Sequence, residues 1–210
     1  MTAAIADYRT AIYALLADAG KVIFTDLDVD QALRWALSEY SMHRPLIRTY
    51  QYSVLGTTAF HTMPTTFITR QVTKVELWNA LPDSVIELGF YAYRPDEQWV
   101  INTMFQVENG EVLTVYYSDV HQVDGLDAAA GTTVPVADES WLQVGAAGRA
   151  ALIRAMNRIE NIGMNQNEVT QYRQVAADYL SRFAYFVAGS SPGNVGLPDF
   201  PGDHPNNLVY

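Results

Sequence analysis

The side chains that could do acid–base or metal chemistry are few and scattered along this sequence. The four histidines, His43, His61, His121 and His204, are far apart. None has a second histidine or a carboxylate at the spacing by which a helix holds a metal ion. Asp119 and His121 are two residues apart in a predicted strand, so both project from one face and could form an acid–base pair. On a strand edge such a pair is more often an exposed polar patch, which is the interpretation we favour.

Three alternate acids have the spacing that begins a calcium-binding loop: Asp26, Asp28 and Asp30. Such a loop needs glycine at its sixth position and glutamate at its twelfth, whereas this chain has Gln31 and Leu37 there. Asp28 followed by Gln31 is instead typical of a helix cap, where negative charge is also favourable. We therefore expect these acids to start a helix rather than to bind calcium.

Known catalytic and nucleotide-binding motifs are absent from the sequence. It has no G-x-S-x-G, no P-loop and no G-x-G-x-x-G. Gly145-Ala-Ala-Gly148 lies within a helical pattern and indicates close packing, not a phosphate loop. Glu76 and Glu87 could face each other across strands, although nothing in the sequence fixes their spacing. We predict that the chain is not an enzyme and has no cofactor and no metal site.

Length and composition predict one folded domain or two small ones. The chain has 210 residues, of which 49% are hydrophobic and 17% charged, enough to bury a sizeable core. No apolar run approaches the length that crosses a bilayer, and the first residues lack the pattern of a signal peptide. With no cysteine, disulfides and thiolate zinc sites are excluded, which is compatible with a reducing compartment.

The charge of the chain restricts its partners. A formal net charge of −10 repels phosphate backbones, which argues against a protein that reads a DNA groove. Repulsion is still compatible with DNA that passes close by without sticking. The 13 Tyr, 4 Trp and 8 Phe fall mostly in the predicted strands or on helix faces, where core and interface packing explain them best.

The periodicity predicts four helices. The first spans residues 2–19, with Thr2 as its cap and Gly20 as its stop. The second follows Asp28 and ends before Pro45, and its predicted buried face consists of Val29, Leu33, Ala36, Leu37 and Tyr40. The last helix follows residue 165, and its predicted face consists of Val169, Tyr172, Ala176, Leu180, Phe183 and Val187.

The longest predicted helix runs from Asp138 to Glu160. One face carries Leu142, Gly145, Ala146, Leu152, Ile153, Met156 and Ile159, and a second face carries a strip of alanines, Ala147, Ala151 and Ala155. A strip of alanines lets another backbone approach closely, so we expect neighbours on two sides. Arg149 projects from the apolar side. It either extends its charge to solvent from the edge of the core or forms an ion pair across a subunit interface.

Between residues 46 and 123 the pattern changes to strands. Asn109-Gly110 is typical of a two-residue type I′ hairpin turn, which would place Val107 opposite Val112, Phe105 opposite Thr114, and Met104 opposite Val115. Residues 85–93 are expected to form one strand with Ile86, Leu88, Phe90 and Ala92 on one face. Both faces of the predicted strands carry apolar residues, so we predict an antiparallel sandwich or barrel-like module of five or six strands.

The predicted fold class is α+β, a small helical bundle with an inserted antiparallel β module. Residues 1–45 and 137–188 form the bundle, 46–123 the module, 124–136 a loop and 189–210 an extended C-terminal arm. The arm is rich in Gly, Pro and Asn, yet it ends in three apolar residues, Leu208, Val209 and Tyr210. These either dock on a neighbour, for example as an added strand, or fray. Our candidate subunit contacts are Arg149, the alanine strip and this tip.

Particular segments resemble the head-to-tail connector (adaptor) proteins of tailed bacteriophages. They are the helix DLDVDQALRWALSEYS, the strand segments LIRTY, VELW and GEVLTVYYSDVH, and the helix WLQVGAAGRAALIRAMNRIE, together covering roughly residues 25 to 187. The minimal members of that family are shorter and all-helical, so the inserted β module is a departure, and the exact position in the neck stays open.

The resemblance implies a structural virion protein without cofactor. It would form a homo-oligomeric ring, commonly of twelve copies, docked on the portal and tail or neck proteins. Double-stranded DNA would pass through its channel during packaging and ejection. The ring would be assembled in the host cytoplasm, without a membrane.

Two other classes of function stay open. The β module could bind a glycan or a protein partner on an aromatic face, for which Tyr91, Tyr93 and Trp99 are candidates. An enzyme would need a pocket that unites Asp119, His121 and another polar group.

Overall fold

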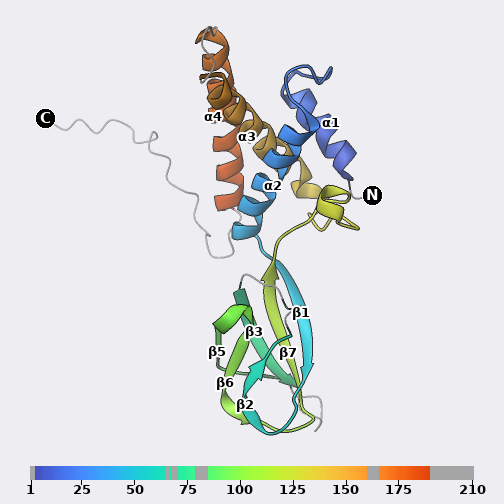
Figure 1. The fold of residues 1–210 in the computed structure, drawn as a ribbon, viewed down its shortest axis with the longest axis vertical. Helices are drawn as coiled ribbons and strands as arrows, with labels where there is room; N and C mark the ends of the chain where they lie inside the picture. The colour runs from blue at the N-terminus through green and yellow to red at the C-terminus, as the bar shows by residue number, and fades with distance from the viewer. Residues whose placement is uncertain (1–2, 65–66, 68–70, 79–84, 160–165, 190–210) are drawn as a thin grey trace, which may run out of the picture. The chain divides into compact units, whose positions relative to one another are not determined.

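The chain divides into two compact units, shown in Figure 1. The computed structural model describes residues 3–64, 67, 71–78, 85–159 and 166–189. Residues 1–44 and 121–210 form the helical unit, and residues 45–120 form the β unit. Helices and antiparallel strands occur in separate segments, which confirms the α+β class.

The helical unit is built around its third helix, although the fourth is longer. Its helices are α1 (Ile5–Leu15), α2 (Asp26–His43), α3 (Glu139–Ile159) and α4 (Gln166–Gly189), with short 3-10 turns at Leu126–Ala128 and Val136–Asp138. α3 packs against each of the other three. The expected face of α2 is buried, and so is the N-terminal part of the α3 face, whereas Met156 is exposed.

The limits of α1 and α2 differ from the predictions. α2 begins one turn earlier than expected, because Thr25 is the cap and Asp28 reaches back to the Thr25 backbone N–H at 2.9 Å. α1 is capped at Ala4 rather than Thr2 and ends at Leu15, before Gly20. Its exit uses a left-handed residue, Ala17, with φ of 54°. The predicted C-terminal limit of α1 was wrong because Ala17 adopts the left-handed conformation that was expected of Gly20.

The described residues of the β unit form seven strands in two antiparallel sheets. The strands are β1 (Leu46–Ser53), β2 (Thr58–Thr62), β3 (Gln71–Trp78), β4 (Val85–Glu87), β5 (Phe90–Tyr93), β6 (Val100–Val107) and β7 (Val112–Asp119). One sheet has the order β1-β7-β3-β4 and the other β2-β6-β5. Both sheets contribute to one core, including Val75, Leu77, Leu113, Val115, Ile101 and Val107. The two inner faces therefore pack on each other, as in a sandwich.

The predicted hairpin at Asn109-Gly110 is wrong. β6 pairs with β2 and β5, whereas β7 pairs with β1 and β3, so the turn joins the two sheets. A type I′ turn needs positive φ at both central residues, and of the two only Gly110, at 90°, has it. Val54 takes the place of the expected partner strand: its N–H donates to Glu111 O, and its carbonyl accepts from Gly110 N.

The strand expected over residues 85–93 is also divided between the sheets. β4 pairs with β3, and β5 pairs with β6. The change of sheet occurs at Leu88, whose N–H donates to Val75 O, and at Gly89, whose carbonyl accepts from Met104 N. Leu88 is buried while Ile86 is exposed, so these two residues do not share a face as predicted.

Candidate binding faces of the β unit

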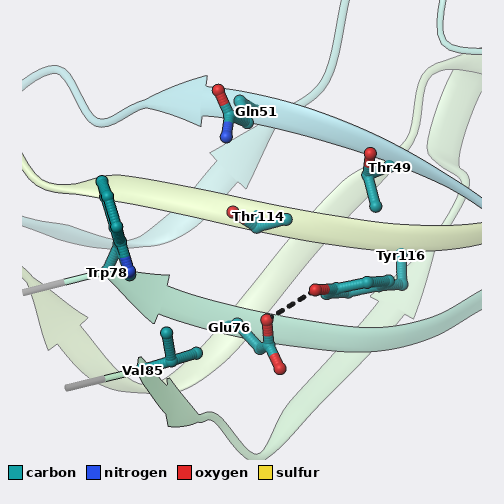
Figure 2. A pocket seen from close by; sticks show the side chains of 7 residues that line it. All are labelled: Thr49, Gln51, Glu76, Trp78, Val85, Thr114 and Tyr116. Carbon is teal, nitrogen blue, oxygen red and sulfur yellow. Dashed lines mark hydrogen bonds between the residues drawn. The ribbon is translucent and has the colours of Figure 1, made fainter. Parts of the chain in front are cut away.

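The outer face of the four-stranded sheet carries an open groove of about 320 Å³. Figure 2 shows the side chains along it, which come from all four strands. We call this surface the groove face, and it consists of Thr49, Gln51, Glu76, Trp78, Val85, Thr114 and Tyr116.

Strand pairing accounts for this set of residues. Side chains of directly paired residues lie on the same side of a sheet. One row across the four strands runs Gln51, Thr114, Glu76 and Glu87, and the next runs Ser53, Val112, Trp78 and Val85. The residues that alternate with them, such as Leu77 and Leu113, point into the core.

A carboxylate is held in place in the groove. The Tyr116 hydroxyl donates a 2.7 Å hydrogen bond to Glu76 Oε2, drawn in Figure 2. Lys74 is paired with Glu76, and its Nζ lies 3.5 Å from Glu87 Oε2. The hydrogen bond from Lys74, followed by that from Tyr116, lowers the pKa of Glu76. The bond to Glu76 in turn raises the pKa of Tyr116. The groove therefore offers a fixed negative acceptor beside an exposed indole.

The outer face of the three-stranded sheet is richer in apolar surface. Its rows run Phe60, Asn102 and Tyr91, and then Thr62, Val100 and Tyr93. Met104 lies beside them, over Gly89. We call Phe60, Tyr91, Tyr93 and Met104 the aromatic face; they are 58, 64, 45 and 59% exposed.

Sequence reasoning located only part of these surfaces. Tyr91 and Tyr93 are exposed as expected, but Trp99 packs against the core of the β unit. Trp78 and Phe60 were missed. Alternation along the strand could have indicated them. Trp78 directly follows the buried Leu77, and Phe60 directly precedes the buried His61, so both project from the outer side of their sheet.

Arg149 has a neighbour within its own chain. Its guanidinium lies over the indole of Trp35, with Cζ 5.2 Å from the ring centroid, a cation–π arrangement. The side chain is half-buried, so it lies at the edge of the core. An additional contact with another subunit stays a prediction.

The alanine strip faces the interior of the helical unit. Ala147, Ala151 and Ala155 are fully buried. A subunit contact at the strip stays a prediction. Such a contact would require the segments of the same chain that bury these alanines to move away from them. The predicted tip, Leu208, Val209 and Tyr210, lies outside the described residues.

The two glycines of α3 allow α4 to approach closely. A Cβ at Gly145 would lie 2.7 Å from Phe183 Cγ, and one at Gly148 would lie 2.9 Å from Tyr179 Cβ. Both distances are too short for real atoms. The glycines therefore serve helix packing, as the helical pattern around them indicated.

Asp119 and His121 belong to different units, and each has partners of its own. Asp119 Oδ2 lies 2.8 Å from Arg48 Nε within the β unit. His121 is buried in the helical unit, where its ring nitrogens lie 3.1 Å from the carbonyl oxygens of Thr133 and Arg44. Each side chain thus serves a structural contact in its own unit.

The acidic triplet is used in a comparable way. Asp26 accepts hydrogen bonds from Tyr13 and Lys21, and Asp30 is paired with Arg9 at 2.7 Å. Across the described ranges, no group of three or more His, Cys, Asp or Glu side chains could hold a metal ion. In that same part of the chain, no helix is both long and apolar enough to span a membrane.

A buried polar cluster in the helical unit was not predicted. Asp138, directly before α3, accepts from the Tyr40 hydroxyl at 2.5 Å and is paired with Arg44 at 2.6 Å. Arg44 also lies 4.7 Å from the ring of Phe186. Burial, followed by the hydrogen bond to Asp138, raises the pKa of Tyr40 to about 12. Because Asp138 is 94 positions from Arg44, no local pattern marks the pair.

Comparison with known proteins does not assign a family. No protein-family model and no curated protein matches the sequence. Among solved structures, one similar chain comes from a structure described as "Neck of empty GTA particle computed with C6 symmetry". It is 14% identical, the match covers 80% of this chain and 88% of that chain, and the TM-score is 0.30. A likeness of this size assigns neither family nor function.

Proposed function

We propose that the chain is a structural subunit of a phage-like particle, without a catalytic role. Copies form a ring in the neck, between portal and tail, and double-stranded DNA passes through the ring during packaging and ejection. The proposal is supported by the sequence resemblance to head-to-tail connectors and by one structural observation, the distribution of exposed apolar side chains.

Most large apolar side chains that are exposed among the described residues belong to the β unit. They are Ile47, Leu55, Phe60, Trp78, Val85, Ile86, Tyr91, Tyr93, Met104 and Phe105. Scattered exposed apolar residues are normal, but larger contiguous patches mark interaction sites. The aromatic face is such a patch, and a subunit of an assembly would cover it.

The charge of the chain fits the same role. With a net charge of −10, a ring of many copies carries a strong negative potential. DNA that moves through its channel is repelled rather than bound, which favours sliding. The resemblance implies about twelve copies, and the subunit would bind portal and tail or neck proteins.

The groove face favours a second candidate function, a binding module for a glycan or a protein partner. An exposed indole beside hydrogen-bonding side chains, here Trp78 beside Gln51, Thr114 and Glu76, is a combination found in ligand sites. In that role the chain would act at the periphery of a particle or as a free monomer.

Immunogold labelling of intact particles, with antibodies raised against the purified chain, distinguishes the two candidates. Label at the head–tail junction is the expected result, and it should disappear when the antibody is first saturated with free chain. Label at the tail tip or on fibres would contradict the neck assignment and favour the binding module. Particles that lack the chain altogether would reject both virion roles.

A further inference from the structure

We propose that copies of the β unit pack head to tail, with the aromatic face of one copy covering the groove face of the next. This inference rests on the proposed function, because a ring requires each subunit to present two different contact surfaces. It adds which two surfaces of the β unit make these contacts.

The two faces lie on opposite sides of the β unit. Figure 1 shows its two sheets, and their inner faces share one core, so their outer faces point away from each other. Contact between unlike faces is heterologous and continues from copy to copy until it closes into a ring. Contact between like faces would instead form a pair and leave the second face of each copy exposed.

The aromatic face supplies a substantial part of the area that such a contact needs. At roughly 200 Å² per aromatic side chain, the exposed fractions of Phe60, Tyr91 and Tyr93 correspond to about 330 Å² of uncovered aromatic surface, and Met104 adds to it. One partner contributes about 800 Å² to a standard interface. The aromatic side chains, with the remaining outer surface of β2, β5 and β6, can supply a large share of this area.

The longest strands of the two faces match in length. β6, at the centre of the aromatic face, has 8 residues, as do β1, β3 and β7 of the groove face. A strand of that length extends about 27 Å. The central strands of the two faces can therefore lie alongside each other over their full length, whereas β2, β5 and β4 are shorter, with 5, 4 and 3 residues.

Shape and charge favour the unlike pairing over a contact between two groove faces. The groove, at about 320 Å³, has the volume of about ten water molecules, enough to receive an aromatic ring. Glu76 and Glu87 are paired across β3 and β4, with Lys74 beside them. Two such surfaces would bring like charges together. The side chains of the aromatic face are neutral, and its tyrosine hydroxyls can donate to carboxylates.

Cysteine cross-linking tests this arrangement without background, because the chain has no cysteine of its own. Tyr91→Cys reports the aromatic face and Gln51→Cys the groove face. A tagged chain with one substitution is assembled with an untagged chain carrying the other, on the portal ring if assembly needs it, and then oxidised. We expect disulfide-linked mixed dimers, and a ladder of bands from a chain that carries both substitutions.

Gln174→Cys provides the matched control, since it changes an exposed glutamine on α4 rather than on the groove face. Cross-linking between Tyr91→Cys and Gln174→Cys at an equal rate would overturn the inference. Homodimers of Tyr91→Cys alone would overturn it too, because they show that like faces meet. Cross-linking of Tyr91→Cys to Val209→Cys would show that the C-terminal segment covers the aromatic face, which also excludes the proposed contact.

Native mass spectrometry of the same samples separates failure of this inference from failure of the proposed function. Intact rings, or complexes on the portal, that yield no mixed dimers would overturn the face-to-face contact and leave the neck role standing. Samples that stay monomeric with the portal present would contradict the neck role, and the inference with it.

Discussion

A methyl group at Gly145 would lie 2.7 Å from Cγ of Phe183, well inside the contact distance of the ring. Phe183 is almost fully buried, and its ring also lies 6.1 Å from that of Trp35. It therefore has little freedom to move aside. This contact fixes how closely α4 packs against α3.

Gly145→Ala should lower the free energy of unfolding by about 1–2 kcal/mol. Overpacking a core costs roughly 1–3 kcal/mol, and alanine recovers up to about 1 kcal/mol of helix propensity. Urea unfolding followed by circular dichroism measures the difference. Gly189→Ala is the control, since a Cβ there meets nothing within 4 Å. If both variants are equally stable, the close approach of the two helices is not what the glycine provides.

Asp138→Ala should destabilise the chain by about 2–4 kcal/mol, because it leaves Arg44 and the Tyr40 hydroxyl without their shared acceptor. Tyr40→Phe removes one donor only and should cost about 1–2 kcal/mol. In a double-mutant cycle the two effects should fall short of additivity by more than about 0.5 kcal/mol. Strict additivity would show that the two residues do not act as a unit.

The stability of the β unit should fall in mild acid because of His61. This side chain is fully buried, and burial lowers its pKa from an ordinary value of 6.5. Below pH 6.5 the unfolded chain therefore binds a proton that the folded chain does not, and unfolding becomes easier as pH falls. Above pH 6.5 the contribution of His61 to the free energy of unfolding is constant.

The measurement is urea unfolding of wild type and His61→Leu between pH 5 and pH 8. The difference in unfolding free energy between them should change below about pH 6.5, with a limiting slope of about 1.4 kcal/mol per pH unit. A difference that does not depend on pH would show that His61 is protonated equally in both states.

Arg149→Ala should destabilise the helical unit by about 1 kcal/mol, from the lost cation–π contact with Trp35 and the lost packing of the arginine stem. Arg149→Lys keeps the charge and part of the contact, so the loss of stability in this variant should be smaller. Thermal unfolding of the isolated chain measures both. If alanine has no effect there but weakens assembly, the role of Arg149 is a contact between subunits.

The sequence predicted the elements better than their partners. Helical periodicity identified the buried face of α2, because the spacing of apolar residues along one helix is a local pattern. The predicted hairpin at Asn109-Gly110 is wrong because an Asn-Gly turn is compatible with two outcomes: a hairpin within one sheet, or a connection between two sheets. Val54, more than fifty positions earlier, bonds to the turn and thereby selects the one that separates β6 from β7.

The candidate binding faces show the same limit. Alternation places Trp78 and Phe60 on the side opposite to the core, but only pairing brings Phe60 and Tyr91 into one row, through Asn102 between them. The groove likewise needs β1 and β3 on either side of β7. Non-local pairing creates both surfaces, and no single segment encodes them.

The central claim is that this chain is a subunit of a neck ring. Native mass spectrometry of the full chain, alone over a range of concentrations and then mixed with the portal ring, tests it most directly. The account predicts a closed oligomer, or a complex of fixed stoichiometry on the portal. A strict monomer that ignores the portal at every concentration would contradict it.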